Sequence, residues 1–165
     1  MKDLLTNYTK YNLWANTKVC GFLEKLEPAL LDKELVSSFD TIRKTVYHIW
    51  DAETIWFKRL NGESLREWPS ESYKGTDTDF IKPFLEQSKK FTEYVGPKHN
   101  EELLVDCEFS TLKGDKFVIK ICNILLHCMN HSTYHRGQIT TMLRSVGFTE
   151  LSSTDYLAYV IEHVK

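Results

Sequence analysis

The segment with the clearest chemical signature is rich in histidine. His127, His131 and His135 recur at intervals of four residues, among apolar residues spaced three and four apart. Because an α-helix advances about 100° per residue, the three imidazoles lie on one face of a helix, and that face points to the core. Residues four apart have Cβ atoms about 5 to 6 Å from each other, so two of these imidazoles can bind one metal ion.

A metal site built on one helix needs a ligand from a second element, and His48 is the natural choice. It lies on the flank of the apolar stripe of an earlier predicted helix, beside Thr45 and Ala52. Asp51, three residues later, offers an oxygen donor in the same region, although its place nearer the polar face favours exposure to solvent. Three neutral imidazoles leave positions on the ion open to water or substrate, which is typical of reactive sites rather than closed structural ones.

Each of these histidines also has an ordinary structural explanation. A single histidine on a helix is usually a hydrogen-bonded interior or surface residue, and the four-residue spacing also arises by chance. His99, which follows Gly96 and Pro97, and His163, near the end of the sequence, are assigned to this structural class. Three unpaired polar rings on one inward stripe would be costly to bury, and this cost favours a shared metal.

Four further residues lie close to the histidines along the same helix. Gln138 projects back to the histidine stripe and is predicted to contact a metal ligand or line the pocket, whereas Arg136 points about 100° away from His135 and fits an ion pair or an interhelical contact. His127 either supports the pocket or is a buried ring bonded to a neighbour. Cys128 could add a thiolate, but packing as a core thiol is the commoner role.

The elements that must position these residues are long amphipathic helices. Apolar periodicity predicts helices over residues 3–26, from the candidate caps Ser38 and Asp40 to Asn61-Gly62, over 77–95 and over 118–144, with a short one over 155–164. Residues 61–76 are predicted to be a loop with Trp68 as its one large anchor, and residues 103–117 a hairpin or irregular excursion. Such helices solve the burial problem by packing together, so we predict an all-α fold, an up-and-down-type four-helix bundle.

Length and composition limit the other possibilities. A chain of 165 residues with 42% hydrophobic residues is expected to form one domain over residues 1–165. Its formal net charge of −2 provides no broad positive field, so nucleic acid is not an expected main partner. We also expect no membrane span, and the four cysteines without a CxxC pair favour free thiols in the cytoplasm.

Several stretches of the sequence together resemble one known family. They are Tyr11-Asn12-Leu13-Trp14-Ala15-Asn16, His48-Ile49-Trp50-Asp51-Ala52-Glu53, Asn130-His131-Ser132-Thr133-Tyr134-His135-Arg136-Gly137-Gln138, and Leu143-Arg144-Ser145-Val146-Gly147 with Thr154-Asp155-Tyr156. In this order, and over nearly the whole chain, they resemble the DinB family. The specific part is the histidine-rich stretch that follows a histidine on the second helix.

The resemblance implies a DinB/YfiT-like four-helix bundle, usually a homodimer, with a divalent metal held by three histidines. Carried onto this sequence, the metal ligands are His48, His131 and His135. The imidazole donors favour zinc or nickel, while iron and manganese are also compatible. The family's name refers to induction by DNA damage, so the resemblance also implies a part in a stress response. Asp155 matches a family position and could cap the last helix or close the mouth of the pocket.

Two classes of function follow from these observations. In the first, the protein is a metal-dependent enzyme, either a hydrolase or a transferase of low-molecular-weight thiols such as those found in the wider superfamily. Metal coordination can lower the pKa of water from about 15.7 to near 7, which makes hydrolysis at neutral pH reasonable. In the second, the site is structural in a non-catalytic metal-binding or stress-response dimer. The sequence indicates no catalytic base, and it leaves the substrate open.

Overall fold

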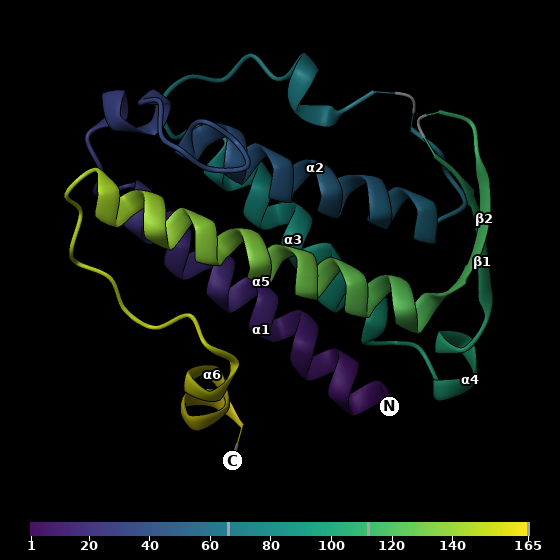
Figure 1. Cartoon of the computed structure of the whole chain (residues 1–165). Coiled ribbons are helices and arrows are strands. Elements are labelled where there is room, and N and C mark those ends of the chain that lie inside the picture. Colours follow the sequence, from purple (N-terminus) through teal and green to yellow (C-terminus); the bar gives the residue numbers. More distant parts are fainter. Residues whose placement is uncertain (66, 112, 165) are drawn as a thin grey trace.

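The computed structural model describes residues 1–65, 67–111 and 113–164 (Figure 1). Three residues lie outside the described part of the chain: Arg66, Leu112 and Lys165. Arg66 belongs to the predicted loop, Leu112 to the predicted excursion, and Lys165 to the predicted domain. Four long helices dominate: α1 (Lys2–Leu23), α2 (Ile42–Leu60), α3 (Ile81–Val95) and α5 (Ile121–Ser145). The shorter elements are η1 (Pro28–Asp32), η2 (Pro69–Ser72), α4 (Asn100–Leu103), β1 (Asp106–Ser110), β2 (Lys116–Lys120) and α6 (Tyr156–His163). The prediction of an all-α four-helix bundle is confirmed.

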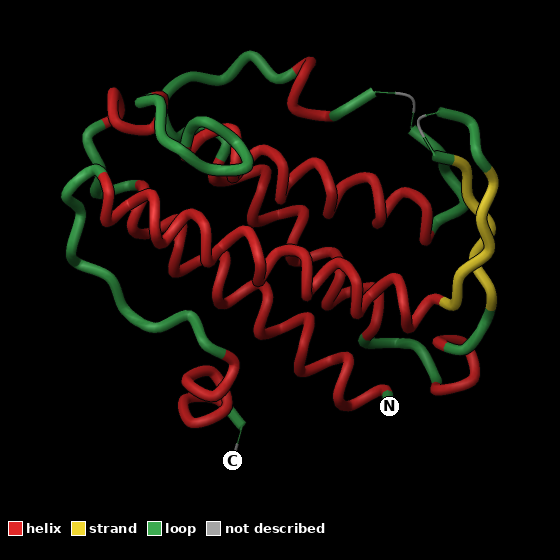
Figure 2. Tube along the Cα trace, in the orientation of Figure 1, coloured by secondary structure: helices red, strands yellow, loops and turns green. Residues whose placement is uncertain are grey.

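The order of the helices within the bundle is not the simple alternation of a chain that runs up and down. Both α1 and α2 pack against α3 and α5, so α1 and α2 lie diagonally across the bundle. Helices α2 and α3 run in the same direction, while α1 and α5 run in the opposite direction (Figure 1). The connection between α2 and α3 makes this possible, because it returns along the length of α2 before α3 begins (Figure 2).

Several helix boundaries differ from the predictions, and local interactions explain the differences. The cap of α2 is Thr41 rather than Ser38 or Asp40, because the Thr41 side chain accepts a hydrogen bond from the backbone N–H of Lys44 at 3.1 Å. Helix α3 begins later than predicted, after Asp77, which has a φ of 42° that a helix cannot contain. Helix α1 ends at Leu23 rather than at residue 26, and α5 begins at Ile121 rather than at 118 because the preceding residues form β2.

The predicted excursion is a β-hairpin. Strands β1 and β2 pair in antiparallel register, with Cys107 opposite Ile119 and Phe109 opposite Phe117. The side chains of Cys107 and Phe109 are buried against one end of the bundle, so the hairpin covers that end. Two short elements, η1 and α4, were not predicted, because each has fewer than two turns and gives no apolar period to detect.

The apolar core consists of two large clusters, one toward each end of the bundle. One includes Leu23, Val46 and Phe84, and the other includes Leu5, Phe91 and Leu125. All four cysteines are buried free thiols, as predicted. In the part of the chain that the structure describes, no helix is both long and apolar enough to cross a membrane.

A layer of buried polar side chains lies between the two clusters. The Glu53 carboxylate of α2 accepts hydrogen bonds from the amides of Asn12 and Asn16 of α1, at 2.7 and 3.0 Å. The carbonyl oxygens of the same two asparagines accept from Arg136 of α5, at 2.6 and 2.8 Å. Ser88 of α3 donates to Glu53 at 2.6 Å, so the layer joins all four helices. Arg136 is therefore an interhelical partner, one of the two roles predicted for it.

We predict that Glu53→Gln will lower the free energy of unfolding by about 3 kcal/mol, because it leaves the buried Arg136 guanidinium without an opposite charge. The matched control is Glu93→Gln, which removes a charge from an exposed pair with Lys89 and should cost less than about 0.5 kcal/mol. Urea unfolding at neutral pH measures both values. Equal stabilities of the two variants would contradict the role assigned to this layer.

Candidate metal centre

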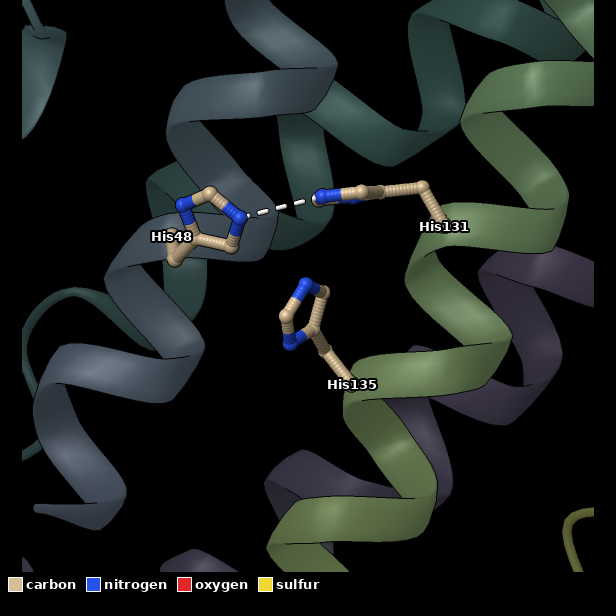
Figure 3. A group of neighbouring side chains, drawn as sticks. All are labelled: His48, His131 and His135. Atoms are coloured by element: carbon tan, nitrogen blue, oxygen red, sulfur yellow. Dashed lines mark hydrogen bonds between the residues drawn. The ribbon is translucent and has the colours of Figure 1, made fainter. Parts of the chain in front are cut away.

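The structure brings His48 of α2 together with His131 and His135 of α5 (Figure 3). One ring nitrogen from each residue lies within 4.8 Å of the others. The Nε2 atoms of His48 and His131 are 3.0 Å apart, and the ring of His135 lies 4.6 Å from that of His48, between centroids. Three nitrogen donors from two helices therefore converge on one point.

The helices explain this convergence. Helices α2 and α5 are antiparallel neighbours, and His131 and His135 are one turn apart on the face of α5 that meets α2. His135 is buried, whereas His48 and His131 are half-buried. The centre thus lies at the edge of the interface between the helices, close to solvent on one side.

Burial keeps the three imidazoles neutral. Desolvation and the neighbouring His135 lower the pKa of His48 to about 4. Desolvation, followed by His135, His48 and His127, lowers the pKa of His131 to about 4. Burial also lowers the pKa of His135, although its hydrogen bond with Gln138 partly opposes this shift. Neutral rings present lone pairs, so near pH 7 the centre has ligands without first releasing protons.

The donor set fits a divalent metal ion. Two neutral imidazoles whose Nε2 atoms approach to 3.0 Å can share at most one proton in a hydrogen bond. The Nδ1 atom of His131 is buried and has no hydrogen-bond partner among the described residues. A cation bound by the three nitrogens would use the converging lone pairs, and imidazoles suit zinc, nickel, iron and manganese.

Gln138 contacts His135 directly. Its side-chain oxygen accepts a hydrogen bond from Nδ1 of His135 at 2.7 Å, and its amide donates to the Ser38 hydroxyl at 2.9 Å. A proton on Nδ1 leaves the Nε2 lone pair of His135 free to bind a metal. Sequence reasoning placed Gln138 near the histidine stripe, and Ser38, considered there only as a cap, anchors its far end.

His127 lies one turn from the centre and is not among its three histidines. Its ring is 5.8 Å from that of His131, between centroids, and packs edge-on against Trp56 at 5.1 Å. Desolvation and the positive charge of Arg59 lower the pKa of His127. The His127 side chain is exposed, so the buried ring considered in the sequence is not what the structure shows.

Asp51 also lies outside the three-histidine group. The sequence favoured its exposure to solvent, but the structure shows it buried. Its two carboxylate oxygens accept hydrogen bonds from the backbone N–H and the hydroxyl of Ser70, at 2.7 and 2.6 Å. The cause is the connection between α2 and α3, which folds back over Asp51. The oxygen donor suggested by the sequence therefore holds this connection.

Two other residues considered in the sequence lie outside the centre. Cys128 is buried in the apolar cluster around Phe91 and Leu125, which agrees with the core thiol role. Asp155 precedes α6 without a side-chain capping bond and accepts from the hydroxyl of Ser153 at 2.9 Å.

Sequence reasoning missed Phe39 and underestimated Trp68. The ring of Phe39 lies 4.3 Å from that of His48 and 5.8 Å from that of His135, between centroids. Both Phe39 and Trp68 line a cavity of about 430 Å³ that opens beside His48. Both residues come from irregular segments, where no helical or strand period exists to show which side chain points inward.

Comparisons with known proteins agree with this architecture. The model of the DinB family matches residues 1–163. The chain is 26% identical to protein DinB of Bacillus subtilis, over 97% of this chain and 95% of that protein. Among solved structures, it resembles YfiT of B. subtilis, described as a "probable metal-dependent hydrolase with an unusual four-helix bundle topology", with a TM-score of 0.71 at 18% identity over 90% of this chain and 91% of YfiT. A DinB-like protein of B. subtilis, YjoA, gives a TM-score of 0.67 at 17% identity over 90% of this chain and 97% of that one.

We predict that the wild-type protein will bind one zinc ion per chain and that His48→Ala, His131→Ala and His135→Ala will each weaken binding at least 100-fold, because each removes a ligand. His163→Ala, whose imidazole lies on α6, is the matched control and should bind like the wild type. Isothermal titration of the metal-free proteins with zinc gives the affinities. Equal affinity in all five proteins would contradict the assignment.

The stability of the metal-free protein should fall as the pH falls from about 6.5 toward 4. The folded pKa values of His48 and His131, both about 4, lie below the ordinary value of 6.5, so the unfolded chain takes up protons first in this range. Urea unfolding of the wild type and of a His48→Gln/His131→Gln variant, at pH 7.5 and pH 5, measures the effect. The wild type should lose more stability than the variant, and a variant with the same pH dependence would contradict this explanation.

Proposed function

The chain belongs to the DinB family, and from that premise we propose that it is a metal-dependent enzyme that uses His48, His131 and His135 to hold a divalent ion. The reaction is attack by a small nucleophile on an electrophilic substrate. The nucleophile is water in a hydrolase or a low-molecular-weight thiol in a thiol transferase. The description of YfiT as a probable metal-dependent hydrolase supports the first of these.

The proposal rests on one observation: the group of three histidines adjoins a cavity large enough for a small-molecule substrate. His48 belongs both to the histidine group and to the lining of the cavity of about 430 Å³. Pockets for small molecules commonly measure about 300 to 1,000 Å³. A purely structural metal site is closed by four protein ligands, whereas this site offers three with a cavity beside them.

The residues around the centre have separate tasks in this proposal. A divalent ion would act as a Lewis acid and would lower the pKa of a water or thiol in its open positions. Gln138 holds the proton of His135 on Nδ1 and so keeps the other nitrogen available. Phe39 covers the rings of His48 and His135 and limits the access of bulk water. Zinc or nickel is our first choice of ion, with iron or manganese as further candidates.

We further propose that the protein acts as a homodimer in the cytoplasm and does not bind nucleic acid. The family resemblance supports the dimer, and large apolar side chains exposed on α5 and α6 support it as well, including Tyr134, Leu157 and Ile161. The net charge of −2 argues against nucleic acid. Light scattering coupled to size-exclusion chromatography should give twice the chain mass of 19.4 kDa, and a value of 19.4 kDa would contradict the dimer.

Activity is tested with protein loaded in turn with zinc, nickel, iron or manganese. Hydrolysis is followed with 4-nitrophenyl esters, and thiol transfer with monochlorobimane and a low-molecular-weight thiol. We expect turnover in one assay that is at least 100-fold above the metal-free protein and is lost in His135→Ala but kept in His163→Ala. Protein that holds one metal ion per chain but shows no turnover with any ion would favour the non-catalytic metal-binding alternative.

A further inference from the structure

The cavity beside the histidine centre has several aromatic side chains in its lining. Phe39, Tyr47 and Trp68 contribute side chains to it, and His48 provides its contact with the centre. A molecule that fills the cavity therefore lies against aromatic rings and also contacts His48, one of the three histidines. Aromatic lining favours flat apolar groups, which gain from stacking and from burial of their surface.

Two aromatic side chains from separate segments lie near His48 in the lining of this cavity. Phe39, just before α2, approaches the ring of His48 to 4.3 Å at an interplanar angle of 31°. Trp68, just before η2, lies 6.4 Å from the same imidazole. Trp68 is 37% exposed, so part of its indole is not covered by protein and can contact a ligand.

Three charged residues line the cavity, Lys44, Asp51 and Glu71, and the first two have partners within the protein. The Lys44 ammonium lies 2.7 Å from a carboxylate oxygen of Asp40. The Asp51 carboxylate accepts both hydrogen bonds from Ser70. Glu71 is exposed at the cavity, and the lining surface as a whole is largely apolar.

Asp51 fixes the position of Trp68. Its bonds to the backbone N–H and hydroxyl of Ser70 are short, at 2.7 and 2.6 Å, and the carboxylate is buried. Hydrogen bonds to an ionised carboxylate are stronger than those between neutral groups. Ser70 is two residues from Trp68, so this pair of bonds anchors the indole at the side of the cavity.

We propose that this cavity binds a flat, uncharged aromatic group of the substrate, with Phe39 and Trp68 as its walls and Asp51 as the positioning residue of Trp68. The inference rests on the proposed function, because it places the reacting part of the same substrate at the three histidines. It assigns the substrate class, a small aromatic compound whose electrophilic group lies next to the ring.

The test uses zinc-loaded protein and two probes that differ only in their tail. Acetohydroxamate and benzohydroxamate both bind zinc through the hydroxamate, but only the second carries a phenyl ring. Isothermal titration should show benzohydroxamate binding at least 10-fold more tightly than acetohydroxamate in the wild type. In Trp68→Ala and in Phe39→Ala the ratio of the two affinities should fall to about 2-fold or less.

Asp51→Asn tests the positioning role. It should lower the preference for benzohydroxamate while the affinities for zinc and for acetohydroxamate stay those of the wild type, a pattern that general loss of structure would not give. Trp14→Phe is the matched control, because Trp14 lies on α1 against Tyr159 of α6, and it should keep the full preference.

The outcomes separate the inference from the function on which it rests. Wild-type protein that binds zinc and both hydroxamates equally would overturn the aromatic subsite and leave the metal centre in place. A preference for benzohydroxamate that survives in Trp68→Ala and Phe39→Ala would also overturn it. Wild-type protein that binds no zinc would overturn the proposed function, and with it the inference.

Discussion

The buried layer of Glu53, Asn12, Asn16 and Arg136 is the constraint on which the rest of the structure depends. It is the point at which all four long helices meet through polar contacts, between two apolar clusters that by themselves would tolerate small shifts along the helix axes. Hydrogen bonds between buried charged and amide groups tolerate little displacement, so the layer fixes the register of α5 against α1 and α2. Arg136 and Ser132, which both bond within this layer, directly follow His135 and His131 in the sequence. The contacts that hold α5 in register therefore also hold its two histidines opposite His48.

The parallel course of α2 and α3 has a consequence for the site. A tight turn after α2 would have left His48 and Asp51 facing solvent. The connection instead returns over α2, where Asp51 holds Ser70 and where Trp68 closes one side of the cavity. The segment before α2 contributes Phe39 to the same cavity, and Gln138 bonds to Ser38 in that segment. Two irregular segments, each attached to a helix by side-chain hydrogen bonds, therefore form a pocket beside the histidines at the interface of α2 and α5.

The sequence alone predicted the parts that depend on periodicity. The four long helices and the common face of the histidines on α5 follow from spacing, and His48 was identified because it lies on the flank of an apolar stripe. The direction of α3 could not be predicted in this way, because a polar connection of about 20 residues fits either a loop or a return along the bundle. No local pattern marks Glu53 as the centre of a buried polar layer, because only the tertiary structure supplies the four side chains that bond to it. Phe39 and the Asp51–Ser70 pair depend on how irregular segments fold back onto α2, which no helical or strand period encodes.

The central claim is that one imidazole of α2 and two of α5 bind a single metal ion. X-ray absorption spectroscopy of zinc-loaded protein tests it most directly, because it reports the ligand atoms around the ion. The account predicts three imidazole nitrogens at about 2.0 to 2.1 Å, a remaining shell of nitrogen or oxygen, and no sulfur. A sulfur ligand at about 2.3 Å, or fewer than three imidazoles around the zinc, would contradict it.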